Sequence, residues 1–351
     1  MANPLLGIGM HGVGALSSSV CYTPQKKTRA WSWQTYWMAQ AAVCWLLLPI
    51  LVAALTTPHL RSVLGQAPRS AMLDSFLLGL GYGIGGTAFG VAIQYLGFSV
   101  TYALSIGISC VVGTLLPPLL SHQMGALLRR SGSNCIFAGI LVATAGIFLS
   151  GCAGKLRDRD ASRTRDAEIK SLKHLRKGLF FAVVAGLLSA VFGLALDAGQ
   201  PLADVAARYG AGQFQGNIIL IFACGGAFVT TAVICLVLHI REGSLHEYIA
   251  FADGPERRLL AANFGLATLT GVLWYGQFFF YEIGHTLMGK YSFVSWALHM
   301  SMLVLFSAFV GLFLREWSHC RPRTIAALTV ALLLLVGAVA AIGWGSYQGG
   351  S

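Results

Sequence analysis

The segment that divides this chain is GKLRDRDASRTRDAEIKSLKHLRK, residues 154–177, which holds nine basic and four acidic side chains. The rest is largely apolar: of 351 residues, 56% are hydrophobic and only 11% are charged. Soluble domains carry about 25% charged residues, so this chain lacks the polar surface that a protein in water needs. The composition predicts a polytopic membrane protein. Because the basic residues lie between apolar blocks, the net charge of +11 indicates membrane topology and no nucleic-acid partner.

Ten apolar stretches approach the length of about 20 residues that a helix needs to cross a bilayer. Five precede the charged segment and five follow it, so we expect an all-α protein with ten transmembrane helices. The stretches lie near residues 5–24, 36–57, 72–93, 99–120, 134–154, 178–198, 215–239, 259–283, 292–314 and 324–345. The first is interpreted as a membrane helix and not a signal peptide, because no basic region precedes its apolar residues.

The basic residues predict the orientation of the chain. Loops after odd-numbered stretches hold 18 of the 24 Lys and Arg residues, and loops after even-numbered stretches hold the other 6. Cytoplasmic loops are the ones enriched in Lys and Arg. We therefore expect the odd loops in the cytoplasm, both termini outside, and a multi-pass protein of the inner (plasma) membrane.

Two short similarities connect the halves of the chain. VTYAL at 100–104 resembles VSWAL at 294–298, and GALS at 14–17 resembles GLLS at 186–189. Each pair falls in corresponding stretches of the two halves. Because five is odd, such a repeat must be inverted, as in many secondary transporters. The predicted organisation is a first five-helix repeat, a charged cytoplasmic linker and a second repeat, at 1–154, 155–177 and 178–351.

Glycine and cysteine patterns indicate packing and no cofactor. The pattern G-x-G-x-x-G occurs at Gly7–Gly12 and Gly81–Gly86, but no strand precedes either one, so a nucleotide site is not supported. Glycines every three or four residues, such as Gly79 and Gly83, favour close helix packing instead. The eight cysteines are scattered singly, which supports neither a disulfide framework nor a metal site.

Ionisable residues within the apolar stretches are His11, Asp197, Glu282 and His299. Each costs at least about 2.5 kcal/mol at the centre of a membrane helix unless it is paired or hydrated, so function is the first interpretation. A carboxylate in a partly dry cavity can load and release a proton, which makes Glu282 and Asp197 the proton-coupling candidates. The alternatives are a solvated interfacial charge for Asp197 and a core position for His299.

The eighth stretch carries a polar stripe. Trp274, Gln277, Tyr281 and His285 fall within an arc of about 80° on a helix, with Glu282 on its flank. Aromatic faces combined with amides and imidazoles are typical of sugar sites. Packing of these aromatic residues in the core or at the membrane interface is the alternative.

Two other stretches contribute to the same candidate site. His11, Ser18 and Tyr22 project along one line of the first stretch, and His299 lies beside Trp296 in the ninth. The predicted substrate-binding residues are therefore His11, Tyr22, Trp274, Gln277, Tyr281, Trp296 and His299.

Several segments together resemble the L-rhamnose-proton symporter family of the drug/metabolite transporter superfamily. They include His11-Gly12, Cys21–Pro24, Lys26-Lys27, Trp31–Trp33, Gln94–Gly97, Gly113–Leu115, Leu273–Tyr275, Gln277–Tyr281, Gly284-His285, Ser295–Met300 and Arg315–Trp317. The resemblance covers nearly the whole chain, and it implies ten helices, no cofactor and import of a 6-deoxyhexose with a proton. One departure follows Trp31–Trp33, where the family commonly has Glu. This chain has Gln34 there, and the glutamine side chain cannot titrate.

We therefore predict a secondary active transporter that imports a deoxy sugar such as L-rhamnose by proton symport, through alternating access around a central site. Its partners would be the sugar, the proton and the lipid bilayer. The first alternative is an exporter or exchanger of another small metabolite from the same superfamily. The second is a membrane-embedded enzyme or receptor, but the sequence offers no Ser-His or metal constellation at the helix ends.

Overall fold

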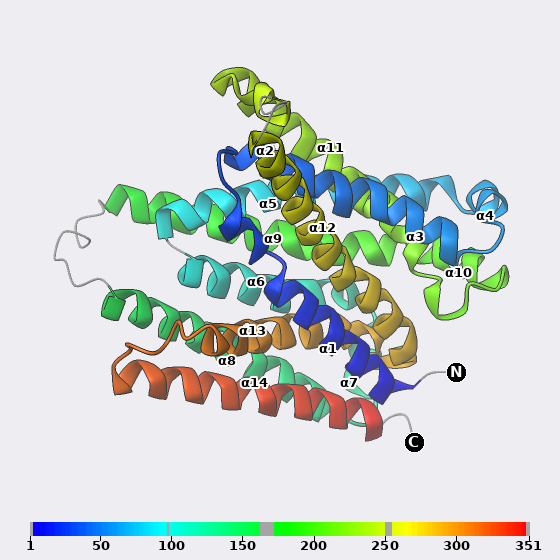
Figure 1. The fold of residues 1–351 in the computed structure, drawn as a ribbon. Coiled ribbons are helices and arrows are strands. Elements are labelled where there is room, and N and C mark those ends of the chain that lie inside the picture. The colour runs from blue at the N-terminus through cyan, green and yellow to red at the C-terminus, as the bar shows by residue number, and fades with distance from the viewer. Residues whose placement is uncertain (1–2, 97, 162–171, 250–254, 349–351) are drawn as a thin grey trace. The chain divides into compact units, whose positions relative to one another are not determined.

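The computed structural model describes residues 3–96, 98–161, 172–249 and 255–348, and the secondary structure within these ranges is entirely helical (Figure 1). Eight stretches in them are long and apolar enough to cross a membrane. They are Trp33–Thr56, Arg69–Ala92, Ala103–Leu120, Ser133–Arg157, Arg176–Arg208, Gly212–Glu242, Arg257–Phe313 and Pro322–Gln348. The protein is thus a multi-pass membrane protein that is helical throughout its described ranges.

The chain folds into two compact units. Unit 1 contains Met1–Ser19, Gly85–Leu194 and Gly284–Ser351, and unit 2 contains Val20–Ile84 and Ala195–Ile283. Each unit therefore draws on both halves of the sequence. Each is described separately below.

Unit 1 is built around a long pair of helices, α8 (Ser133–Ala161) and α14 (Pro322–Gln348), which run side by side (Figure 1). Small residues bring the two backbones together: a Cβ atom added at Gly139 would lie 3.1 Å from the Ala338 carbonyl oxygen. The other elements of unit 1 are α1 (Pro4–Val20), the later part of α5 (Arg69–Leu96), α6 (Phe98–Leu120), α7 (Met124–Leu128), most of α9 (Leu172–Ala198), the end of α12 (Pro255–Met288), η6 (Gly289–Val294) and α13 (Ser295–Phe313).

Unit 2 is organised around α11 (Asn217–Glu242), which contacts α2 (Trp33–Ala41), α3 (Leu48–Thr56) and α10 (Gln200–Arg208). Between α2 and α3 the chain forms the π-helix η2 (Ala42–Leu47), which also contacts α11. The remaining elements are η1 (Pro24–Lys27), α4 (Leu60–Gln66), the first part of α5, the end of α9, η4 (Gly212–Phe214), η5 (Ser244–Tyr248) and most of α12.

The glycines of α5 pack closely against α11 in unit 2. A Cβ atom at Gly79 would overlap the Ala223 carbonyl oxygen, and one at Gly83 would lie 2.7 Å from the Ala227 carbonyl oxygen. At these positions only glycine lets the backbones approach so closely. The predicted packing role is confirmed for both residues.

Helix α8 continues to Ala161, past the predicted end at 154, and α9 begins at Leu172. The flanks of the predicted linker 155–177 are therefore helical, while its residues 162–171 lie outside the described ranges. The apolar run marks where the membrane-compatible sequence ends and not where the helix ends. No glycine or proline follows Gly154 before Ala161, so nothing stops the helix there.

Helix α1 ends at Val20 and not near residue 24, so Tyr22 is not on the same helix as His11. Pro24 is the cause, because it lacks the N–H that would bond to the Val20 carbonyl, which accepts instead from Thr23 N at 3.0 Å in a turn. The predicted line through His11, Ser18 and Tyr22 is therefore wrong at Tyr22.

Candidate functional site

The predicted site residues divide between the two units, and the division falls within α12, after Ile283. Unit 2 holds Tyr22, Asp197, Trp274, Gln277, Tyr281 and Glu282. Unit 1 holds His11, Trp296 and His299.

An aromatic cluster in unit 2 surrounds the polar stripe of α12. The ring centroid of Trp274 lies 5.2 Å from that of Trp45, edge to face, and 4.8 Å from that of Phe278. Tyr82 lies 6.0 Å from Trp45 and completes the cluster. Gln277, 5% exposed, makes no hydrogen bond with any residue of the described ranges. An available amide beside aromatic faces suits a hydroxylated, partly apolar ligand.

Sequence reasoning missed Trp45 and Tyr82. Trp45 lies in the π-helix η2, and Tyr82 lies within the glycine pattern Gly81–Gly86, which was interpreted only as packing. Their residue type could have indicated them, because both are amphipathic aromatic residues inside predicted spans. Their proximity to Trp274 depends on helix packing that no local pattern records.

Glu282 is buried at the N-terminus of α11. It is 1% exposed, and its Oε1 atom has no hydrogen-bond partner in the described part of the chain. A Cβ atom added at Gly216, the N-cap of α11, would collide with the Glu282 carboxylate. The N-terminus of a helix carries partial positive charge and favours a carboxylate beside it. Because buried polar groups are normally paired, an unpartnered carboxylate oxygen here points to a role beyond structure.

Other buried polar atoms near Glu282 also lack partners among the described residues. Asn217, next to Gly216, donates from Nδ2 to Thr56 Oγ1 at 3.0 Å, but its Oδ1 atom has no donor. The Tyr275 hydroxyl is likewise buried without a partner. Tyr275 and Glu282 lie within electrostatic range of each other. This end of α11 therefore gathers oxygen atoms whose hydrogen-bonding capacity is unused.

Asp197, the second candidate carboxylate, has an exposed side chain at the C-terminal end of α9. Its neighbours Ala195 and Leu196 are the residues that face the core there. Of the two candidate carboxylates, Glu282 is therefore buried, and Asp197 is exposed, which agrees with the alternative of an interfacial charge. Asp197 still lies within electrostatic range of Glu282.

At the other end of α11, unit 2 contains a fully connected polar network. Gln34 donates from Nε2 to Glu242 Oε2 at 2.6 Å and to Ser244 Oγ at 2.8 Å. His239 Nδ1 lies 2.8 Å from Ser244 Oγ, and His239 Nε2 lies 3.1 Å from the Tyr248 hydroxyl. Since Ser244 accepts from Gln34, its own hydrogen is available to His239 Nδ1. The network is satisfied by a neutral imidazole that carries its proton on Nε2.

Glu247 joins this end of unit 2 to the start of α2. Its Oε2 atom accepts hydrogen bonds from Ser32 N at 2.7 Å, Ser32 Oγ at 2.9 Å and Thr35 Oγ1 at 2.6 Å. Partial burial raises the pKa of Glu247, but the hydrogen bonds from Thr35 and Ser32 outweigh it and hold the pKa below its ordinary value. The carboxylate caps α2 from a distant part of the chain.

In unit 1 the two predicted histidines meet. The rings of His11 and His299 are fully buried and lie edge to face, with centroids 6.0 Å apart. Gly284 faces His11, since an added Cβ atom would lie 3.0 Å from its Nε2 atom. Within the described ranges no group of three or more His, Cys, Asp or Glu residues is arranged to hold a metal ion. The pair therefore offers polar ring edges in an apolar interior.

Trp296 and Tyr22 have packing contacts of their own. The indole N–H of Trp296 donates to the Ser109 carbonyl at 2.9 Å, and Gly113 packs directly on its ring. Tyr22 stacks on Trp37 with centroids 5.9 Å apart. These contacts favour a structural role for Trp296, whose only N–H donor is already used.

Residues 1–347 match the family model of the L-rhamnose-proton symport protein. The chain belongs to this family. Relatives named L-rhamnose-proton symporter occur in Cronobacter sakazakii, at 34% identity over 98% of this chain and 99% of the relative, and in Salmonella paratyphi A, at 33% identity over the same shares. The relative from Klebsiella pneumoniae subsp. pneumoniae is 33% identical over 97% of each chain. The resemblance to the L-rhamnose-proton symport family is confirmed, and the family is one of transporters and not of enzymes.

Proposed function

We propose that this protein imports L-rhamnose, or a closely related 6-deoxyhexose, together with a proton across the inner membrane by alternating access. The observation that carries the proposal is the match to the L-rhamnose-proton symport family over residues 1–347. The aromatic cluster and the available Gln277 amide add chemical support. Export or exchange of another metabolite is not favoured, because the relatives are named as symporters.

We propose ten transmembrane helices in this protein. The stretch Arg257–Phe313 has 57 residues. A helix of that length would extend about 86 Å, nearly three times the hydrocarbon core of about 30 Å. We assign it to two crossings, α12 and α13, joined at η6. Helix α1, with 17 residues, is the remaining crossing. The charge distribution supports odd loops in the cytoplasm and both termini outside.

We further propose that residues 1–154 and 178–351 form inverted repeats around the charged segment 155–177. The boundaries between the compact units support this. They fall after Ser19 and Leu194, in the first helix of each half, and after Ile84 and Ile283, in the third helix of each half. A structural repeat would place the boundaries between units in corresponding helices of the two halves, as they are here.

For the sugar, we propose contacts from Trp274, Gln277 and Tyr281 on the polar stripe of α12 in unit 2. Within unit 1, taken by itself, His11 and His299 are proposed as residues that bind sugar hydroxyls. The aromatic rings would pack on the C–H faces and the methyl group, while the amide and imidazoles would bind hydroxyls. Tyr22 and Trp296 are proposed as supporting residues, because each is already engaged in stacking or helix packing.

For the proton, we propose Glu282, because it is buried and its Oε1 atom has no partner in the described part of the chain. Asp197, which is exposed, would modulate it through its charge. Moving one charge across 100 mV releases about 2.3 kcal/mol. At about 1.4 kcal/mol per tenfold, this supports about 50-fold accumulation of the sugar.

The test is sugar uptake by the purified protein in liposomes, with and without an imposed inward proton gradient. We expect L-rhamnose to accumulate only with the gradient, and pentoses to be taken up more weakly. Uptake that ignores the gradient would contradict proton coupling. Failure to transport any deoxy sugar, with export of another metabolite, would contradict the proposed substrate.

A further inference from the structure

The turn that ends α13 contains an arginine in a position that normally requires glycine. The N–H of Arg315 bonds to the Leu312 carbonyl at 3.0 Å, and the N–H of Glu316 bonds to the Gly311 carbonyl at 3.0 Å. Arg315 has a φ of 58°, in the left-handed region. This is the Schellman motif, whose left-handed residue is usually glycine because a Cβ atom is unfavourable there. The arginine is therefore not explained by the turn itself.

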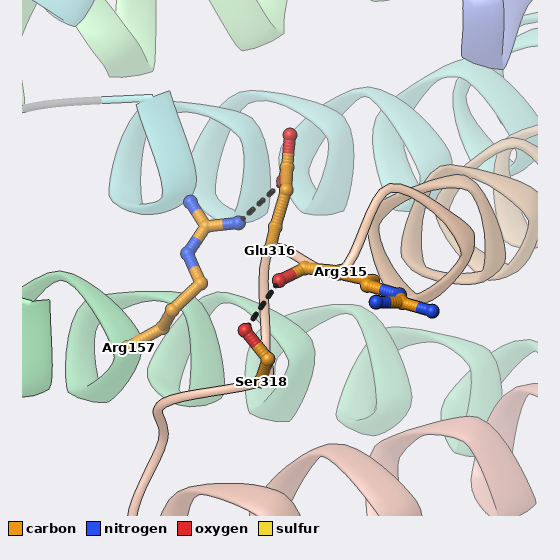
Figure 2. Close-up of polar contacts among 4 residues, drawn as sticks. All are labelled: Arg157, Arg315, Glu316 and Ser318. Atoms are coloured by element: carbon orange, nitrogen blue, oxygen red, sulfur yellow. Dashed lines mark hydrogen bonds and ion pairs between the residues drawn. The ribbon is translucent and has the colours of Figure 1, made fainter.

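The contacts that hold the turn do not use the Arg315 side chain. Arg157 of α8 pairs with Glu316 at 2.9 Å and lies 5.1 Å above the ring of Trp317. Ser318 Oγ donates to the backbone carbonyl of Arg315 at 2.9 Å. In Figure 2 the Arg315 guanidinium points away from the Arg157–Glu316 pair, and it forms no ion pair with any residue in the described ranges. The turn is fixed, and the cation projects from it.

The residues beside Arg315 are apolar and exposed. Phe313 is 87% exposed and Leu314 is 48% exposed, and Arg315 itself is exposed. Because α13 belongs to a candidate membrane span that ends at Phe313, we expect this turn where the acyl chains give way to lipid headgroups. Apolar side chains directed at acyl chains and a cation at the level of the phosphates form an amphipathic lipid contact.

Further positive charge lies in the same unit. Asp160 of α8 accepts hydrogen bonds from Arg321 N at 2.9 Å and Thr324 Oγ1 at 2.7 Å, which ties the end of α8 to the start of α14. The exposed cations near this junction are Lys155, Arg159 and Arg323, and also Arg321, whose guanidinium pairs with Asp160 at 3.4 Å. Such basic clusters at the ends of membrane helices attract anionic lipids.

We propose that Arg315, with Phe313 and Leu314, binds the phosphate group of an anionic phospholipid at the membrane surface. The site is distinct from the sugar and proton residues proposed above, and it does not depend on them. A lipid is preferred to a free phosphate ion because only a lipid would use the two exposed apolar side chains. Tethering the α13–α14 turn to a headgroup would hold this end of unit 1 at the bilayer surface.

The decisive variant is Arg315→Gly, because glycine suits the left-handed turn and should fold at least as well. The melting temperature of the full-length protein is measured at low salt in detergent micelles doped with dioleoylphosphatidylglycerol or with dioleoylphosphatidylcholine. We expect the anionic lipid to raise the melting temperature of the wild type more than the zwitterionic lipid does. Arg315→Gly should lose this difference, and Arg315→Lys should keep part of it.

Arg69→Ala, which removes an exposed arginine at the start of α5, is the matched control and should keep the difference. The proposal is overturned if the wild type does not distinguish the two lipids, or if Arg315→Gly still distinguishes them fully. It is also overturned if water-soluble glycerol phosphate at the same concentration reproduces the effect, since this would assign the site to a free anion.

Discussion

The two ends of α11 in unit 2 carry polar groups of opposite character. At its C-terminal end, Gln34, Glu242, Ser244 and His239 form hydrogen bonds of 2.6 to 2.8 Å to one another. At its N-terminal end, Glu282 and its neighbours leave buried oxygen atoms without partners in the described part of the chain. Both groups surround one 26-residue helix in a largely apolar chain.

This difference distinguishes polar groups that stabilise the fold from polar groups that can bind a ligand or a proton. A network in which every donor meets an acceptor fixes the elements that it joins and has no capacity left for a ligand. A buried carboxylate with unused acceptor capacity is unfavourable until a proton or ligand arrives. Polar residues inside a membrane protein should therefore be compared by how many hydrogen-bond partners they lack, and not by their number.

The largest expected effect comes from removing the charge at the unsatisfied end. Glu282→Gln should bind sugar but lose accumulation driven by a proton gradient, so that about 50-fold accumulation at 100 mV falls to none. Uptake into liposomes with an imposed gradient measures it. Glu242→Gln, at the satisfied end, is the control and should still accumulate sugar. If Glu282→Gln accumulates normally and Asp197→Asn does not, the proton belongs to Asp197.

The next effect concerns the amide that makes no hydrogen bond in the described ranges. Gln277→Ala should weaken sugar binding about tenfold, because a lost partner in a desolvated site costs about 1 to 3 kcal/mol. Binding is measured by titration calorimetry on the purified protein. Gln66→Ala removes an exposed amide that pairs with Tyr209 and should leave affinity unchanged. Wild-type affinity in Gln277→Ala would exclude the residue from the site.

A substitution that replaces the amide nitrogen of Gln34 with an oxygen should break the satisfied network. Gln34→Glu replaces a donor 2.6 Å from Glu242 with a second carboxylate. We expect a lower melting temperature at pH 7, equivalent to about 2 kcal/mol, because a hydrogen bond is replaced by repulsion. The loss should shrink near pH 5 as the pair takes up a proton. Gln34→Ala, which lacks the repulsion, should show no such recovery, and a stable Gln34→Glu at pH 7 would contradict this account.

The smallest effect is a pH dependence of stability at Glu247. Because its pKa is lowered in the folded protein, Glu247 stabilises the fold above the pKa of the unfolded chain. This contribution is lost as the pH falls through the folded-state pKa. The melting temperature of Glu247→Gln should therefore be below that of the wild type at neutral pH, with the difference closing in acid. If the difference in melting temperature between Glu247→Gln and the wild type stays constant with pH, ionisation of Glu247 does not stabilise the fold.

The sequence predicts much of the helical fold because bilayer thickness sets the length of local apolar stretches. Apolar runs locate the helices, and glycine spacing predicts close helix packing at Gly79 and Gly83, which the structure places against α11. The family resemblance rests on motifs spread along the chain and is confirmed over residues 1–347.

Other features escape sequence reasoning because hydropathy does not distinguish a lipid-facing side chain from one buried in protein. For this reason Asp197 and Glu282 looked alike in sequence, although only Glu282 is buried. The pairing of Gln34 with Glu242 joins residues 208 positions apart, and no local pattern encodes it. Trp45 joins the aromatic cluster for the same reason.

The π-helix η2 has a consequence for how the gene can change. It lies between Gln34, in the satisfied network, and Thr56, which accepts a hydrogen bond from Asn217 at the other end of α11. A π-turn holds one residue more than the α-helical path between the same two ends, so deleting one residue within Ala42–Leu47 would convert it to α-helix and keep Thr56 facing Asn217. An inserted residue would instead rotate everything beyond it by about 100° and turn Thr56 away from Asn217. Single-codon deletions should therefore be tolerated in this short stretch, and insertions should be excluded from it.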